Sequence, residues 1–116
     1  MNERLVCLPL AFQGEQDADG VMGVYIPDDV GFLLKGISHF VTFTGTPTSQ
    51  TIDIQDDTVD LTDAIAIDIS TNGYTELSTP AQIAGGSVIE VDLNLAGGST
   101  PTATGEIGLW GFIDEK

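Results

Sequence analysis

Six aspartates lie within the eighteen residues TIDIQDDTVDLTDAIAID, from Thr51 to Asp68, and no lysine or arginine accompanies them. Carboxylate oxygens are preferred ligands of Ca²⁺, so this acidic run is the first candidate for a metal site. The EF-hand spacing is absent, because no glycine stands where that loop makes its sharp turn. Asp56, Asp57 and Asp60 are weak candidates for an irregular oxygen site. A solvated acidic edge is the favoured interpretation, so the sequence predicts no metal and no cofactor.

Catalytic groups are poorly represented. Glu90 and Asp92 would share one face of a strand about 7 Å apart, but any half-exposed strand produces such pairs. His39 is the only histidine, so neither a histidine pair nor a His-rich metal site can form. Cys7 lies among apolar residues, like a small core side chain. We therefore expect no enzyme activity and no catalytic residues.

The charge of the chain restricts its partners. Eighteen acids against three bases give a net charge of −15, which opposes binding to nucleic acid or to an anionic membrane surface. A single cysteine excludes an internal disulfide. The sequence shows neither a signal peptide nor an apolar run long enough to cross a membrane, so we expect a soluble protein made in a cytoplasm.

Apolar and polar residues alternate with a period of two, and clusters of Gly, Pro, Asn and Asp separate the alternating stretches. This pattern predicts an all-β protein, a single-domain antiparallel β-sandwich or jelly roll with roughly seven or eight strands. In ISHFVTFT one face of the expected strand holds Ile37, His39, Val41 and Phe43, and His39 is expected to be a hydrogen-bonded or partly exposed strand residue. In SVIEVDLNL the face opposite Glu90, Asp92 and Asn94 holds Ile89, Val91, Leu93 and Leu95.

The segment GEIGLWGFID is apolar on both faces. Ile107, Leu109 and Ile113 would lie on one face and Trp110 and Phe112 on the other. This pattern is typical of a strand that is covered on both sides.

Turn chemistry marks the ends of the strands. Asn72-Gly73 favours a type I′ hairpin turn. Pro27-Asp28-Asp29 and Gly85-Gly86 favour a turn and a loop. Within the acidic run, Ile52 and Ile54 would point away from Asp53 and Gln55, and Val59 and Leu61 would repeat the pattern. Asp56-Asp57 would then fall at a turn.

The N-terminal segment differs from the rest, because Pro9 interrupts a strand-like run and the polar GEQDADG follows it. We expect residues 1–19 to form an N-terminal edge strand or an extended arm, and residues 20–116 to form the β-sandwich domain. An extended arm can add to the sheet edge of a neighbouring molecule. The candidate partner-binding residues are therefore Leu5, Val6, Leu8, Leu10 and Phe12.

The order AIAIDISTNGYTEL, AQIAGGSVIEVDLNLAGGS and GEIGLWGFIDEK resembles the small decoration, or cement, proteins of tailed bacteriophage capsids. The resemblance covers about residues 20–115 and rests on the kinds of strands and turns in these segments. It implies a non-enzymatic virion protein that binds the major capsid protein on the outer surface of the head and stabilises the shell. It also implies a homo-oligomer, with a trimer favoured.

The principal alternative is a carbohydrate-binding or adhesion module, such as a tail-fibre tip domain. Such a module would use the same fold, with exposed Tyr74 or Trp110 stacking on a sugar, and calcium at the acidic run. Dependence of binding on sugar or calcium separates the two functions.

Overall fold

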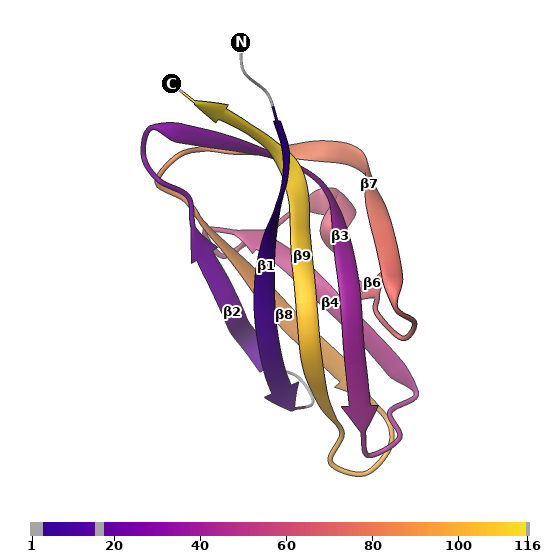
Figure 1. Ribbon diagram of the computed structural model, residues 1–116. Coiled ribbons are helices and arrows are strands. Elements are labelled where there is room, and N and C mark those ends of the chain that lie inside the picture. Colours follow the sequence, from indigo (N-terminus) through magenta and orange to yellow (C-terminus); the bar gives the residue numbers. More distant parts are fainter. Residues whose placement is uncertain (1–3, 16–17, 116) are drawn as a thin grey trace.

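Two antiparallel β-sheets pack face to face in the computed structural model, which describes residues 4–15 and 18–115 (Figure 1). Sheet A has the order β1 (Arg4–Glu15), β9 (Thr102–Glu115), β3 (Val30–Thr44), β7 (Gly73–Ile83). Sheet B has the order β2 (Ala18–Tyr25), β8 (Val88–Ala96), β4 (Ser49–Asp56), β5 (Val59–Asp60), and β6 (Ile67–Asp68) also pairs with β4. The predicted single-domain antiparallel β-sandwich is confirmed.

Helical structure is almost absent from the described part of the chain. The 3-10 turn η1 (Thr62–Ala64) is its one helical element. No helix within the described residues is long and apolar enough to cross a membrane.

The core lies between the two sheets and is built by the predicted alternation. In β3 and β8 the inward-facing positions are buried, including Ile37, Val91 and Leu93 at 0% exposure. Ile52 and Ile54 of β4 are equally buried. The period-two pattern therefore assigned the inner face correctly in these three strands.

Val59 is an exception to that alternation. It belongs to the two-residue strand β5 at the edge of sheet B, and 67% of its surface is exposed. The expectation that it would point inward beside Leu61 was wrong, because the sandwich does not cover this edge position.

The hairpin turn of the acidic run lies at Asp57-Thr58, between β4 and β5, one residue beyond the expected Asp56-Asp57. Both residues have positive φ, of 50° and 72°, as a type I′ turn requires. The expected turn after Pro27 and the loop at Gly85-Gly86 are present, with Val30 N donating to Pro27 O at 3.1 Å.

The hairpin predicted at Asn72-Gly73 was wrong. β6 pairs with β4 in sheet B, whereas β7 begins at Gly73 in sheet A, so this segment crosses between the sheets. Asn72 does not have positive φ; instead its side-chain Oδ1 accepts a hydrogen bond from Val41 N at 3.1 Å. The asparagine supports the crossover through its side chain.

The N-terminal strand β1 lies at the edge of sheet A and pairs with β9 without interruption, from Arg4 opposite Ile113 to Glu15 opposite Thr102. Pro9 is accommodated because an edge strand can leave one N–H side unpaired. The N-terminal strand is thus continuous with the sandwich (Figure 1).

Candidate interaction surface

The acidic run uses its carboxylates to hold loops in place. Asp53 Oδ1 accepts from Ala66 N at 2.7 Å, and Asp57 Oδ1 accepts from Val88 N at 2.8 Å. Asp60 Oδ1 accepts from Gln55 Nε2 at 2.8 Å. Asp56 Oδ1 is buried and has no hydrogen-bond partner among the described residues. These carboxylates do not converge, and the described residues contain no group of three or more side chains that could hold a metal.

The outward side of sheet B is an acidic face, defined by Asp53, Asp60, Asp68, Glu90 and Asp92, of which Asp92 is buried at 7% exposure. Asp53 lies directly opposite Asp92, and Gln55 lies between Asp60 and Glu90. Like charges in opposite positions are unfavourable for strand pairing. The Ser70 hydroxyl and backbone N–H hold the pKa of Asp68 below its usual range. Asp68 therefore stays ionised to lower pH than an ordinary aspartate.

The outer face of sheet A, the side turned away from sheet B, has a different chemistry. Strand register places Leu5, Phe112 and Leu33 in one row across β1, β9 and β3. The next row holds Cys7 opposite Trp110. Apolar side chains therefore cover the part of this face nearest the start of β1.

Three of the large apolar side chains on the outer face of sheet A are strongly exposed. Leu5 is 55% exposed, Phe40 65% and Tyr74 50%. Phe40 lies opposite Glu106, and Tyr74 lies opposite Ser38. Exposed residues of this size from three different strands share this face. Three residues outside sheet A are exposed to a similar extent, namely Tyr25, Val59 and Ile65.

Trp110 is fixed across the outer face of sheet A. Its Nε1 donates to Ser38 Oγ at 2.8 Å. A Cβ atom at Gly108 would lie 2.4 Å from Ser38 Oγ and 3.1 Å from Trp110 Nε1. A side chain at position 108 would therefore collide with the Ser38 hydroxyl and the Trp110 indole, whereas glycine does not.

Replacing Ser38 by alanine is expected to lower the free energy of unfolding by about 0.5–1.5 kcal/mol, because the indole N–H loses its acceptor. Urea denaturation followed by tryptophan fluorescence measures the change. Ser38→Thr retains the hydroxyl and serves as the control. Equal stability of Ser38→Ala and the unmodified protein would show that water replaces this hydrogen bond at no cost.

Lys35 lies over the apolar row. Its Nζ is 5.7 Å from the centre of the Phe112 ring and 3.9 Å from Glu76 Oε1. The ammonium group therefore combines a cation–π contact with a long ion pair, both on the outer face of sheet A.

The end of the sandwich opposite the N and C labels in Figure 1 is formed by the β3–β4 and β8–β9 loops. We call residues 44–49 and 96–102, TGTPTS and AGGSTPT, the uncharged end, since they contain no acid and no base. Ser99 N donates to Gly45 O at 2.9 Å, and Thr48 N donates to Ala96 O at 2.8 Å, so the two loops support each other.

Two threonines in the uncharged end have unfavourable backbone conformations. Thr46 has φ of 50° and Thr100 has φ of 41°. A β-branched residue at positive φ is a true outlier and costs on the order of 1–3 kcal/mol. Strain of this kind is concentrated at binding and catalytic positions, which makes this end a second candidate contact.

His39 is buried at 6% exposure, and its Nε2 lies 3.3 Å from Thr75 Oγ1. Its Nδ1 has no partner among the described residues. The histidine lies on the same side of β3 as Ile37 and Val41, and its side chain is buried rather than partly exposed.

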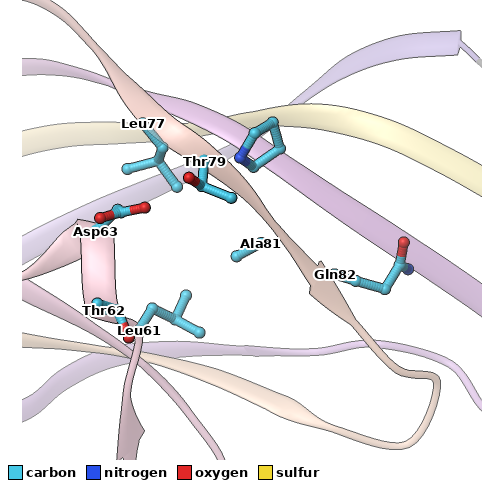
Figure 2. Close-up of a pocket in the computed structure, with 8 residues that line it drawn as sticks. Leu61, Thr62, Asp63, Leu77, Thr79, Ala81 and Gln82 are labelled. Atoms are coloured by element: carbon cyan, nitrogen blue, oxygen red, sulfur yellow. The ribbon is translucent and has the colours of Figure 1, made fainter.

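Figure 2 shows a pocket of about 280 Å³ between η1 and β7. It lies beside the register shift at which β7 residues 77–80 leave the regular pairing with β3. Leu61, Leu77 and Ala81 supply apolar walls, and Asp63 is the one charged lining residue. The pocket could not be predicted from the sequence. The alternation of apolar and polar residues does not reveal that four residues of β7 leave the pairing with β3.

The predicted partner-binding residues divide between the two faces of β1. Val6, Leu8 and Leu10 are partly buried and pack against the core. Leu5 is exposed on the outer face of sheet A. Phe12 belongs to β1, and its side chain lies outside the described residues. Their contact with a partner stays a prediction.

No protein-family model matches the sequence, and a comparison with curated proteins finds no match. Among solved structures, the chain is similar to one in the acidic stable capsid structure of Helicobacter pylori bacteriophage KHP30. The TM-score is 0.45 with 10% identity, and the match covers 99% of this chain and 100% of the other. At this identity the likeness concerns the arrangement of strands alone.

Proposed function

We propose that this protein is a non-enzymatic virion structural protein, a decoration or cement protein that binds the outer surface of a phage head and stabilises the shell. The observation that supports this function best is the segregation of charge. Acids lie in neighbouring positions on the outward side of sheet B. The outer face of sheet A carries exposed apolar side chains among Lys35, Glu76 and Glu106, and the β3–β4 and β8–β9 loops contain no acid and no base.

Segregated charge suits a molecule that attaches to an assembly on one side and faces solvent on the other. An acidic solvent side keeps decorated particles apart by repulsion. It also disfavours contact with nucleic acid, which a protein on the outside of the shell does not need. The partner in this proposal is the major capsid protein.

The uncharged end is the surface that we assign to the shell contact. Its loops are held to each other by backbone hydrogen bonds, so little conformational entropy is lost when they bind. Its threonines and serines can exchange hydrogen bonds with backbone groups of a capsid protein. Glu15 of β1 lies opposite Thr102, at the border of this contact.

Co-sedimentation with shells assembled from the major capsid protein of the same genome tests the proposal. The unmodified protein is expected to sediment with the shells and to raise their melting temperature. Failure to bind such shells would refute the decoration function.

Charge substitutions test the assigned contact. Thr46→Asp and Thr100→Asp place acids in the uncharged end at positions where aspartate tolerates positive φ well. Each is expected to weaken shell binding at least tenfold. Thr58→Asp is the matched control, because Thr58 also has positive φ but lies in the acidic β4–β5 turn. If all three variants bind shells equally well, the uncharged end is not part of the shell contact.

A carbohydrate-binding or adhesion function is the second candidate, favoured by the aromatic residues on the outer face of sheet A. Tyr74 and Phe40 are exposed on the same face as Trp110, and flat aromatic surfaces stack on sugars. Quenching or shift of the Trp110 fluorescence by a glycan, with loss of the response in Tyr74→Ser, would support this function over decoration.

A further inference from the structure

We propose that a second copy of this chain covers the outer face of sheet A, so that two sandwiches stack through this face in a two-fold dimer. The proposal concerns self-association. It does not depend on shell binding and is tested without shells.

The first support is the sequence of β9, which is apolar on both faces. Its inward side chains, including Ile107 and Leu109, are fully buried against sheet B. Its outward side chains Trp110 and Phe112 have no second layer above them within the described chain. A strand with this pattern is typically covered on both sides. In the monomer, sheet B covers the inward side of β9 only.

The second support is where exposed apolar side chains occur. Leu5, Phe40 and Tyr74 come from β1, β3 and β7, and the register brings all three to the outer face of sheet A. Tyr74 lies opposite Ser38, two residues from Phe40, and Leu5 lies farther along the same face. Large apolar patches on the surface of soluble proteins mark interaction sites.

The third support is charge, which selects the orientation of a second copy. Contact through sheet B would bring Asp53, Glu90 and Asp92 of two molecules together. Contact through sheet A leaves both acidic faces outward, and each sandwich is about 22 Å thick. The acidic faces then lie roughly 40 Å apart, several times the Debye length of about 8 Å at physiological ionic strength.

The size of the face is sufficient for a stable dimer. Four strands about 4.8 Å apart and about twelve residues long give a face on the order of 700–800 Å². A standard interface buries about 800 Å² on each partner. The two-fold arrangement is isologous, because the same face serves both molecules.

This contact must accommodate acids on the outer face of sheet A, including Glu76, Glu106 and Asp114. Glu106 lies between Ala11 and Phe40 in the strand register, and Asp114 lies opposite Gly31. Lys35 is the base available on the same face, and its ion pair with Glu76 is long. The remaining repulsion between two chains of charge −15 is screened by salt. Association is therefore expected to strengthen when NaCl is raised from 20 to about 300 mM.

Analytical ultracentrifugation of the full chain tests the proposal. The expected result is a dimer of twice 12.2 kDa at micromolar concentrations. Leu5→Asp and Phe40→Asp should each raise the dimer dissociation constant at least tenfold. Val59→Asp and Ile65→Asp are matched controls, since Val59 and Ile65 are 67% and 49% exposed but lie outside sheet A. These controls should dimerise like the unmodified protein.

Trp110 provides a second measurement, because it is the only tryptophan of the chain and lies on the proposed contact. Its emission should shift to longer wavelength on dilution of the unmodified protein and stay constant for Phe40→Asp. A monomer at all concentrations, a trimer, or an equal effect of the control substitutions would overturn the face-to-face dimer. Circular dichroism of each variant verifies that it is folded.

Discussion

Deletion of residues 1–15 is expected to abolish cooperative folding. β1 pairs with β9 over twelve residues, and its Val6, Leu8 and Leu10 pack against the core. Without β1, the central strand β9 becomes an edge, and part of the core is open to water. A chain of this size is stable by only about 6–17 kcal/mol, and the loss of a whole strand is of similar magnitude.

Urea denaturation followed by far-UV circular dichroism measures this outcome. The full chain should show one sigmoidal transition, whereas the truncated chain should show none. Addition of a synthetic peptide of residues 1–15 is the control and should restore β structure. A truncated protein that unfolds cooperatively would instead make this segment the detachable arm that the sequence left open.

Leu109→Ala is expected to lower the free energy of unfolding by about 3–5 kcal/mol. Leu109 is fully buried in β9, between Leu8 of β1 and Ile37 of β3 in the register. Its neighbours belong to paired strands that cannot close around the void, so the cavity remains.

Leu5→Ala makes the same chemical change on the exposed side of sheet A and is the matched control. It should cost less than about 1 kcal/mol, because Leu5 keeps 55% of its surface in solvent. Both variants are compared by urea denaturation at a protein concentration below that of dimerisation. Similar decreases in the free energy of unfolding for Leu5→Ala and Leu109→Ala would contradict the assignment of inner and outer faces.

The strands and their inner faces could be predicted from the sequence, because a strand has a strict period of two. Ile37 in β3, Leu93 in β8 and Leu109 in β9 each lie on a strand face that this period defines, and all three are buried. Turns were less predictable. The Asn72-Gly73 signal favours a hairpin, but the strands beside it pair with other strands.

The outer face of sheet A could be predicted only in part. The two-faced pattern of β9 was visible, and it indicated a strand covered on both sides. Leu5, Phe40 and Tyr74 come from three strands, and only the pairing of those strands shows that they share a face. Strand order depends on contacts far apart in the sequence, which local periodicity does not encode.

The pairing of Arg4 with Ile113 has a practical consequence for protein engineering. It places the first and last described strands side by side, and Figure 1 shows the N and C labels together, at the end opposite the β3–β4 and β8–β9 loops. A peptide, enzyme or fluorescent domain fused to either terminus would leave from this same end. If the uncharged end holds the shell, a particle coated with such fusions would present its cargo outward, which makes the sandwich a two-terminus display scaffold.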